Sequence, residues 1–174
     1  MAMHHITWPK AKVTIMKYIF PILFALLALP FYAGADNYEI SVTRKGSNLY
    51  KVNGKNIFIQ TRYCYEYVYA ENSFLKMYGY SGEIIFLDSG GKCDVKAVYG
   101  PNEQKPGKYS ITINREEDDW YEIWGQGIYI KRSSCLSLAL GKRAILSISA
   151  GGYGTLYIEN KECMVEGLYS KMKL

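Results

Sequence analysis

The chain has 174 residues, 49% of them apolar, and a net charge of +5 that comes from dispersed Lys and Arg side chains. This composition excludes an intrinsically disordered chain, and the weak, scattered positive charge argues against nucleic-acid binding. The only histidines are His4 and His5, so the chain beyond them offers no histidine for acid–base catalysis or for metal binding.

The first 35 residues have the pattern of a secretory signal peptide. Three lysines precede an apolar run over residues 19–29, and the small residues of Ala33-Gly34-Ala35 follow it. We expect cleavage after Ala35, so that the exported chain begins at Asp36. Met16 is the better start, which makes residues 1–15 an over-extended start or a remnant of cloning.

This segment predicts an exported protein that is periplasmic or secreted. The alternative is an uncleaved membrane anchor, but the apolar run is short against the roughly 20 residues that a transmembrane helix needs. We therefore expect no membrane span after cleavage. Three of the 21 bases and none of the 16 acids precede Asp36, which leaves a net charge of about +2.

An internal repeat organises the rest of the chain. LYKVNGKNIFIQTRYC (49–64) returns 71 residues later as WYEIWGQGIYIKRSSC (120–135), and 38–64 matches 109–135 at eight of 27 positions without a gap. We interpret this as a tandem duplication. It predicts a first unit over 36–99, a linker over 100–108 that is rich in Pro and Gly, and a second unit over 109–174.

Each unit contains two cysteines at matching positions. If the units fold alike, Cys64 pairs with Cys93 and Cys135 with Cys163, and an oxidising compartment makes disulfides the expected state. Units of about 60 residues need such cross-links, because a small core gives little stability. A zinc site built from all four cysteines lacks the close spacing that zinc motifs show, so we predict no metal and no cofactor.

Alternating apolar and polar residues and Gly-rich turns predict an all-β fold. The expected hairpin turn of the first unit is Asn53-Gly54, and the second unit repeats the order of the first. Two architectures remain open, two small barrels or one β-sandwich with a pseudo-twofold axis. We expect strands or extended segments at 38–44, 49–52, 56–63, 64–69, 73–77, 83–87 and 92–99.

Four tyrosines alternate along the extended segment after the first hairpin: Tyr63, Tyr65, Tyr67 and Tyr69. The matching positions of the second unit are Ser134, Leu136, Leu138 and Leu140, and three leucines on one face are typical of a buried face. We therefore predict that Tyr65, Tyr67 and Tyr69 pack in the core or between the units. Tyr63, which matches a serine, is expected to be exposed and is a candidate binding residue.

Trp124 is the second candidate binding residue. It aligns with Asn53, so we expect it at an exposed hairpin tip, where a tryptophan can anchor a contact. The alternative is that it packs against the other unit. Trp120 aligns with Leu49 and is expected in the core.

No constellation of catalytic residues recurs in both units. The acidic run 116–119 lacks a calcium-loop pattern and is expected to be a solvated turn. We therefore predict no catalytic residues and an exported binding protein with a protein or glycan partner; an inhibitor of an enzyme is one version. The alternative is a small secreted hydrolase that uses carboxylates. No oligomeric state follows from the sequence.

Overall fold

The computed structural model describes Gly34 and residues 36–116, 119–133, 135 and 137–174. The expected signal peptide, apart from Gly34, lies outside the described residues. Residues 34–174 form one compact unit. No helix in the described ranges is long and apolar enough to cross a membrane.

All regular structure in the described part of the chain is β-strand, which confirms the expected all-β class. The first six strands are β1 (Asp36–Gly46), β2 (Leu49–Val52), β3 (Phe58–Arg62), β4 (Glu71–Tyr78), β5 (Ser81–Phe86) and β6 (Lys92–Pro101). The remaining six are β7 (Gly107–Arg115), β8 (Trp120–Ile123), β9 (Ile128–Ser133), β10 (Lys142–Ile148), β11 (Gly154–Ile158) and β12 (Lys161–Met172).

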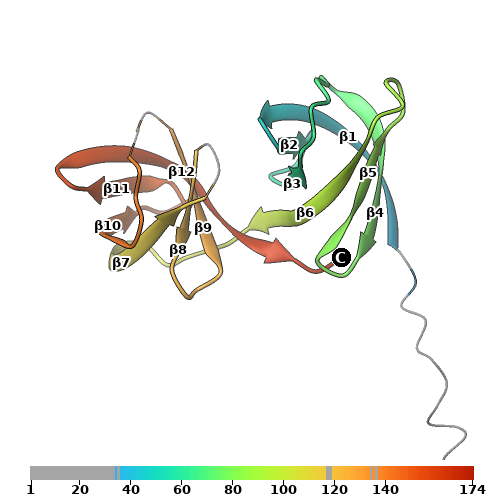
Figure 1. The fold of residues 1–174 in the computed structure, drawn as a ribbon. Helices are drawn as coiled ribbons and strands as arrows, with labels where there is room; N and C mark the ends of the chain where they lie inside the picture. The colour runs from blue at the N-terminus through green and yellow to red at the C-terminus, as the bar shows by residue number, and fades with distance from the viewer. Residues whose placement is uncertain (1–33, 35, 117–118, 134, 136) are drawn as a thin grey trace, which may run out of the picture. The chain divides into compact units, whose positions relative to one another are not determined.

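The strands close into two rings, both visible in Figure 1. In the first ring the order is β6-β3-β2-β1-β4-β5, and β5 pairs back onto β6. In the second it is β12-β9-β8-β7-β10-β11, and β11 pairs back onto β12. Closure leaves no free sheet edge in either ring. Of the two architectures that the sequence left open, the structure therefore has the two small barrels.

The strand register is the same in the two rings. Val42 pairs with Val52 in the first, and the residues 71 further along, Ile113 and Ile123, pair in the second. Tyr50 with Ile59 and Tyr121 with Ile130 show the same correspondence. Similar inward-facing residues select similar registers, because a slip of one residue would turn every side chain to the other face. That the two halves arose by duplication stays a prediction from the sequence.

Strands β6 and β12 pair antiparallel and connect the rings. Tyr99 pairs with Lys171, and Pro101 pairs with Tyr169. Tyr99 and Tyr169 match in the repeat, as do Pro101 and Lys171, so the pairing is reciprocal in the manner of a twofold interface. The expected linker overlaps the end of β6 and the start of β7, and only the segment between them lies outside the strands.

Each ring has its own hydrophobic core, and an aromatic cluster lies where the rings meet. Inside the first ring Tyr50 packs on Phe86, with ring centroids 5.3 Å apart. Trp120 is buried, as expected for core, but it belongs to the cluster between the rings rather than to the second core. That cluster consists of Leu49, Phe58, Ala97, Tyr99, Trp120, Tyr129 and Tyr169.

The two disulfides are Cys64–Cys93 and Cys135–Cys163, the pairing that the repeat predicts. Each fastens the segment that follows β3 or β9 to the last strand of its own ring. Because a ring places β3 and β4 apart, their connection has to cross the end of the barrel, and the disulfide holds it there. Two disulfides fit an oxidising environment.

Candidate binding surfaces

The crossing connection of the first ring, residues 63–70, is called here the tyrosine segment. The sequence predicts extended chain here, either a bent strand or an extended segment, and in the structure the segment lies outside the sheet. Its residues still alternate: Cys64 and Val68 are buried, whereas the four tyrosines point outward and are between 76% and 88% exposed. The prediction that Tyr65, Tyr67 and Tyr69 are buried was therefore wrong, while Tyr63 is exposed as expected.

The second ring shows why the prediction failed. Ser137 and Ala139 face inward, and the expected core residues Leu138 and Leu140 are 75% and 77% exposed. Ser134 and Leu136 lie outside the described residues. The interior of each ring is already filled by large side chains from the strands, such as Tyr50, so only small or medium residues fit beneath the crossing segment.

Hydrogen bonds fix the backbone of the tyrosine segment at both ends and in the middle. The amide of Cys64 donates to Asn48 Oδ1 at 3.0 Å, and the amide of Ala70 donates to Thr43 Oγ1 at 3.0 Å. Between them, the Arg44 amide donates to the Val68 carbonyl at 3.0 Å. Together with the disulfide, these bonds hold the segment in one conformation.

Two residues of the segment have left-handed backbone conformations. The φ angles are +50° at Tyr63 and +52° at Ala70, the first and last residues of the segment. A non-glycine residue in this region costs about 1 kcal/mol or more. Such strain persists only where the surrounding structure determines it, and it is concentrated at functional positions.

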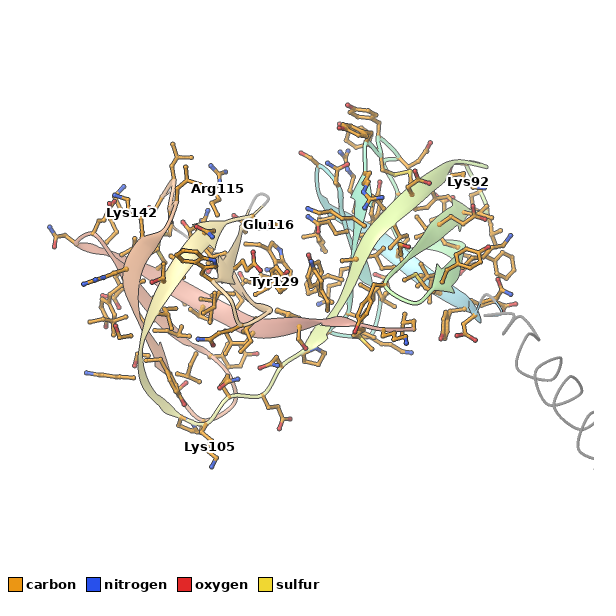
Figure 2. The ribbon with its side chains drawn as sticks, turned by 60° about the horizontal axis from the view of Figure 1, so that its bottom comes forward. Lys92, Lys105, Arg115, Glu116, Tyr129 and Lys142 are labelled. Carbon is orange, nitrogen blue, oxygen red and sulfur yellow. A yellow bond between two sulfur atoms is a disulfide. The ribbon has the colours of Figure 1, made fainter. Side chains whose placement is uncertain are left out.

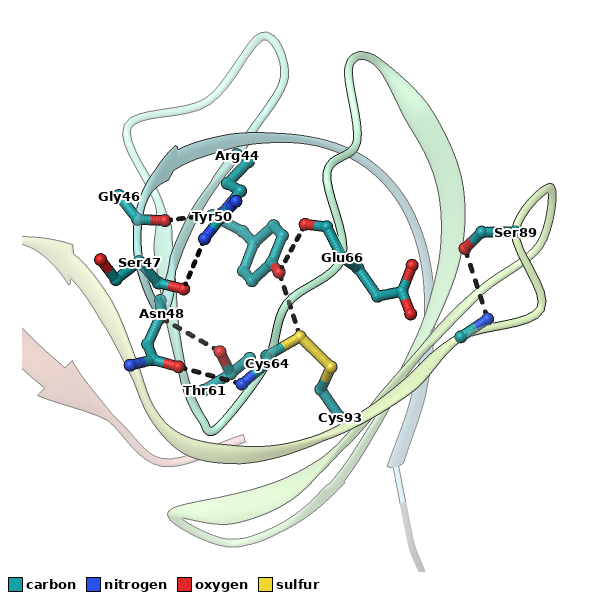
Figure 3. Close-up of a disulfide and its surroundings, with 11 residues drawn as sticks. Arg44, Gly46, Ser47, Asn48, Tyr50, Thr61, Cys64, Glu66, Ser89 and Cys93 are labelled. Atoms are coloured by element: carbon teal, nitrogen blue, oxygen red, sulfur yellow. Dashed lines mark hydrogen bonds between the residues drawn. A yellow bond between two sulfur atoms is a disulfide. The ribbon is translucent and has the colours of Figure 1, made fainter.

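Inside the ring, the Tyr50 hydroxyl supports the segment from below. It donates to the Glu66 carbonyl at 2.9 Å, and its oxygen lies 3.0 Å from Cys64 Sγ (Figure 3). Burial raises the pKa of Tyr50 to about 12. On the outer side, the Arg44 guanidinium lies 3.8 Å from the ring centroid of Tyr67. Arg44 is itself held by the carbonyls of Gly46 and Ser47.

Trp124 lies in the turn between β8 and β9 and is 67% exposed, as expected for a hairpin tip. Its amide donates to the Thr112 carbonyl at 2.9 Å, as Asn53 does to the Ser41 carbonyl at 2.8 Å in the first ring. This exposure argues against the alternative in which Trp124 packs on the other unit. The structure does not bring Trp124 and Tyr63 together in one described contact or cavity.

Sequence reasoning missed a groove where the rings meet. It consists of two adjoining cavities of about 450 and 410 Å³. Both cavities are lined by Asn56, Tyr153, Glu166 and Tyr169. The first is also lined by Lys45, Leu49, Lys51, Phe58, Asp119, Trp120 and Lys131. The second is also lined by the stretch Pro101–Gln104 and by Gly151, Gly152, Gly167 and Leu168. The one sequence signal for this surface is the alignment of Trp120 with Leu49, since both residues line the first cavity.

Some of the acidic residues near the meeting point of the rings form ion pairs. Glu116, labelled in Figure 2, pairs with Lys96 at 2.7 Å. Asp119 lies 3.7 Å from the Arg132 guanidinium, and Glu166 pairs with Lys131. Among the described residues, no group of three or more acids, cysteines or histidines is placed to hold a metal ion. Residues 117 and 118 of the acidic run lie outside the described residues.

Comparisons with protein-family models, with curated proteins and with solved structures found no match to the chain. The functional argument is therefore made from the residues and their geometry. Of the surfaces described above, the tyrosine segment combines the greatest exposure of aromatic rings with the most extensive support of the backbone beneath them.

Proposed function

We propose that this chain is an exported, non-catalytic binding protein that contacts a protein partner through the tyrosine segment. Export is supported by the signal-peptide pattern and by two disulfides that fit an oxidising compartment. The observation that carries the proposal is the outward display of Tyr63, Tyr65, Tyr67 and Tyr69 from a backbone that is held in place.

Four exposed tyrosines supply an interface of ordinary size. A tyrosine covers about 150–250 Å² when it is buried, and a stable interface needs roughly 800 Å² from each partner. Tyrosine also gives a large contact area at a low cost in side-chain entropy. The fixed backbone lowers the cost of binding further, because little of the segment remains to be ordered.

The shape and charge of the segment favour a protein over a glycan. Four rings that are each at least 76% exposed can enter a cleft in a partner, as an inhibitor of an enzyme would require. Between Arg62 and Ala70 the only charged residues are Arg62 and Glu66, and they have opposite signs. Recognition then depends on ring packing and hydroxyl hydrogen bonds, and binding is expected to change little with salt.

The test is site-specific photo-crosslinking in the native envelope or medium. A benzoyl-phenylalanine replaces Tyr65 in one sample, Tyr67 in a second and Tyr80 in a third. Tyr80 is the matched control, since it is also exposed but lies in the turn between β4 and β5. We expect positions 65 and 67 to cross-link one common protein, which position 80 does not cross-link.

Binding is then measured with the isolated partner. Changing Tyr65 and Tyr67 to Ser should weaken binding at least about 30-fold, as for hot-spot residues, whereas Tyr80→Ser should leave it unchanged. If both variants weaken binding equally, or if positions 65 and 67 cross-link no protein, the proposed surface is wrong.

A secreted hydrolase is the alternative, and one observation favours it. Asp119 and Glu166, a pair of acids, line one cavity. Each already has a basic partner, Arg132 or Lys131, and the pair does not recur in the first ring. The alternative would be established if the protein hydrolyses a glycoside and if Asp119→Asn and Glu166→Gln each abolish this activity.

A further inference from the structure

The backbone hydrogen bonds of the tyrosine segment follow a period of two. In extended chain the N–H and C=O of one residue point to the same side, and those of the next residue point to the opposite side. The backbone groups that the barrel binds all belong to even-numbered residues: the N–H of Cys64 and Ala70 and the C=O of Glu66 and Val68. Three of their partners lie on one side of the segment in Figure 3, namely Arg44, Asn48 and Tyr50. One edge of the segment therefore faces the barrel.

The other edge of the segment is free. Neither the N–H nor the C=O of Tyr65, Tyr67 or Tyr69 has a hydrogen-bond partner among the described residues. Buried backbone groups are nearly always hydrogen-bonded, whereas these three residues are at least 76% exposed, which leaves their backbone groups open to water. The odd-numbered residues thus form an edge like that of an outer strand in a sheet.

The segment keeps this edge available for pairing. Residues 63–70 contain neither Lys nor Pro, the residues with which proteins commonly block a strand edge. Hydrogen bonds and the Cys64–Cys93 disulfide hold the backbone, so an incoming strand meets groups that are already aligned. The left-handed residues Tyr63 and Ala70 end the extended stretch, which limits pairing to residues 64–69.

A strand added to this edge places its side chains beside the tyrosine rings. Residues directly opposite one another on neighbouring strands have Cβ atoms about 5 Å apart, and their side chains share a face. The outward face of the segment carries the rings of Tyr65, Tyr67 and Tyr69. Aromatic rings pair favourably across strands with aromatic or β-branched side chains. The segment therefore fits a partner chain that has such residues at every second position.

We propose that the partner adds a β-strand to the free edge of the tyrosine segment. An extended chain of the partner exchanges main-chain hydrogen bonds with Tyr65, Tyr67 and Tyr69, and its aromatic or β-branched side chains pack beside their rings. In strand addition the main-chain bonds give affinity and the alternate side chains give specificity. This mode of binding rests on the proposed function, in which the segment is the contact surface, and adds main-chain pairing to it.

The probe for the test is a linear peptide selected from a displayed library of random sequences. Counter-selection with the double variant Tyr65→Ser, Tyr67→Ser removes peptides that bind elsewhere. Amide exchange is then followed by NMR. With the peptide at about ten times its Kd, exchange at Tyr65, Tyr67 and Tyr69 should slow about tenfold. Exchange at Glu66 and Val68 should not change, because their N–H groups point away from the added strand. Equal slowing at all five amides would overturn strand addition.

The peptide supplies a second readout. Its residues are N-methylated one at a time, which removes one N–H in each case. Binding should fall at every second position, because only alternate N–H groups of an added strand face the edge. A contact made through side chains alone would show no such period.

A single backbone change in the protein tests one of the hydrogen bonds. The α-hydroxy analogue of tyrosine in place of Tyr65 replaces the N–H with an ester oxygen and keeps the ring. Binding should weaken about fivefold, as for the loss of one hydrogen bond. The matched control is the same exchange at Tyr80, which lies in the turn between β4 and β5 and should have no effect.

The outcomes separate strand addition from the proposed function. Strand addition is overturned if no peptide is selected, if N-methylation shows no period of two, or if the ester in place of Tyr65 leaves binding unchanged. If the ester has no effect while the ring variants weaken binding, the proposed function stands without main-chain pairing. If a peptide pairs with the edge but positions 65 and 67 cross-link no protein, the strand-binding edge is supported and the proposed protein contact is wrong.

Discussion

The Tyr50 hydroxyl donates a 2.9 Å hydrogen bond to the Glu66 carbonyl, so a core residue of the first barrel fixes the backbone that displays the exposed tyrosines. Tyr121 makes the matching bond to the Ser137 carbonyl at 2.8 Å in the second barrel. The two bonds make each barrel a control for experiments on the other.

Removing the Tyr50 hydroxyl should loosen the tyrosine segment. Tyr50→Phe is expected to lower the free energy of unfolding by about 1 kcal/mol, the typical value of one hydrogen bond. Hydrogen exchange measured by NMR should become faster at the amides of residues 64–70. Tyr121→Phe should have a similar effect on stability and leave exchange in residues 64–70 unchanged. Equal exchange in the two variants would show that Tyr50 does not hold the segment.

Tyr50 should also give the stability a dependence on alkaline pH. Burial raises its pKa from 10.0 to about 12, so the folded state favours the neutral phenol. The stabilisation is complete below about pH 10 and is lost as the pH rises toward 12. Tyr50→Phe lacks this contribution, so the stability difference between the two proteins should shrink between pH 8 and pH 11. Urea unfolding measures it, and parallel pH profiles would contradict the assignment.

The two disulfides should contribute equally to stability but unequally to binding. Their sequence separations are 29 and 28 residues, so the chain-entropy model gives each roughly 3–4 kcal/mol. Changing Cys64 and Cys93 to Ala should also weaken binding of the partner, because it frees the tyrosine segment. Changing Cys135 and Cys163 to Ala should lower the stability measured by denaturant unfolding by a similar amount but leave binding of the partner unchanged. Equal losses of affinity would mean that the segment is not held by its disulfide.

Because Tyr63 has a left-handed backbone conformation, replacing it should raise the stability of the protein while it weakens binding. Asparagine tolerates this backbone region better than tyrosine, so Tyr63→Asn should raise the free energy of unfolding by up to about 1 kcal/mol. The same change removes an exposed ring and should weaken binding of the partner. Tyr65→Asn should weaken binding without the gain in stability, because Tyr65 is not among the residues with positive φ. A loss of stability in Tyr63→Asn would show that the conformation is not strained.

The exported form of the chain should begin at Asp36. N-terminal sequencing of protein recovered from outside the cytoplasm checks this prediction, and material that retains residues 16–35 would support the membrane anchor instead. Changing Ala33 and Ala35 to bulky residues should block cleavage, since the cleavage site needs small side chains.

Local chemistry and the repeat were enough to predict several features. Asn53-Gly54 predicts a hairpin turn because glycine adopts positive φ freely, and Gly54 and the matching Gly125 have φ angles of +72° and +73°. The cysteine pairing follows from matching positions, and the exposure of Trp124 follows from its alignment with an asparagine. Each of these depends on residues that are close in sequence or on the comparison of one half with the other.

Only the tertiary structure decided which face of the tyrosine segment is outside. Alternation shows that two faces exist, but the space left inside a closed ring determines which one is buried, and Cys64 and Val68 occupy it while the larger tyrosines do not. The groove is a second example, because β6–β12 pairing brings Lys51 and Trp120 to one cavity from different rings. Sequence by itself determined the all-β class, the disulfides and the turns, whereas packing volume and long-range strand pairing determined both candidate binding surfaces.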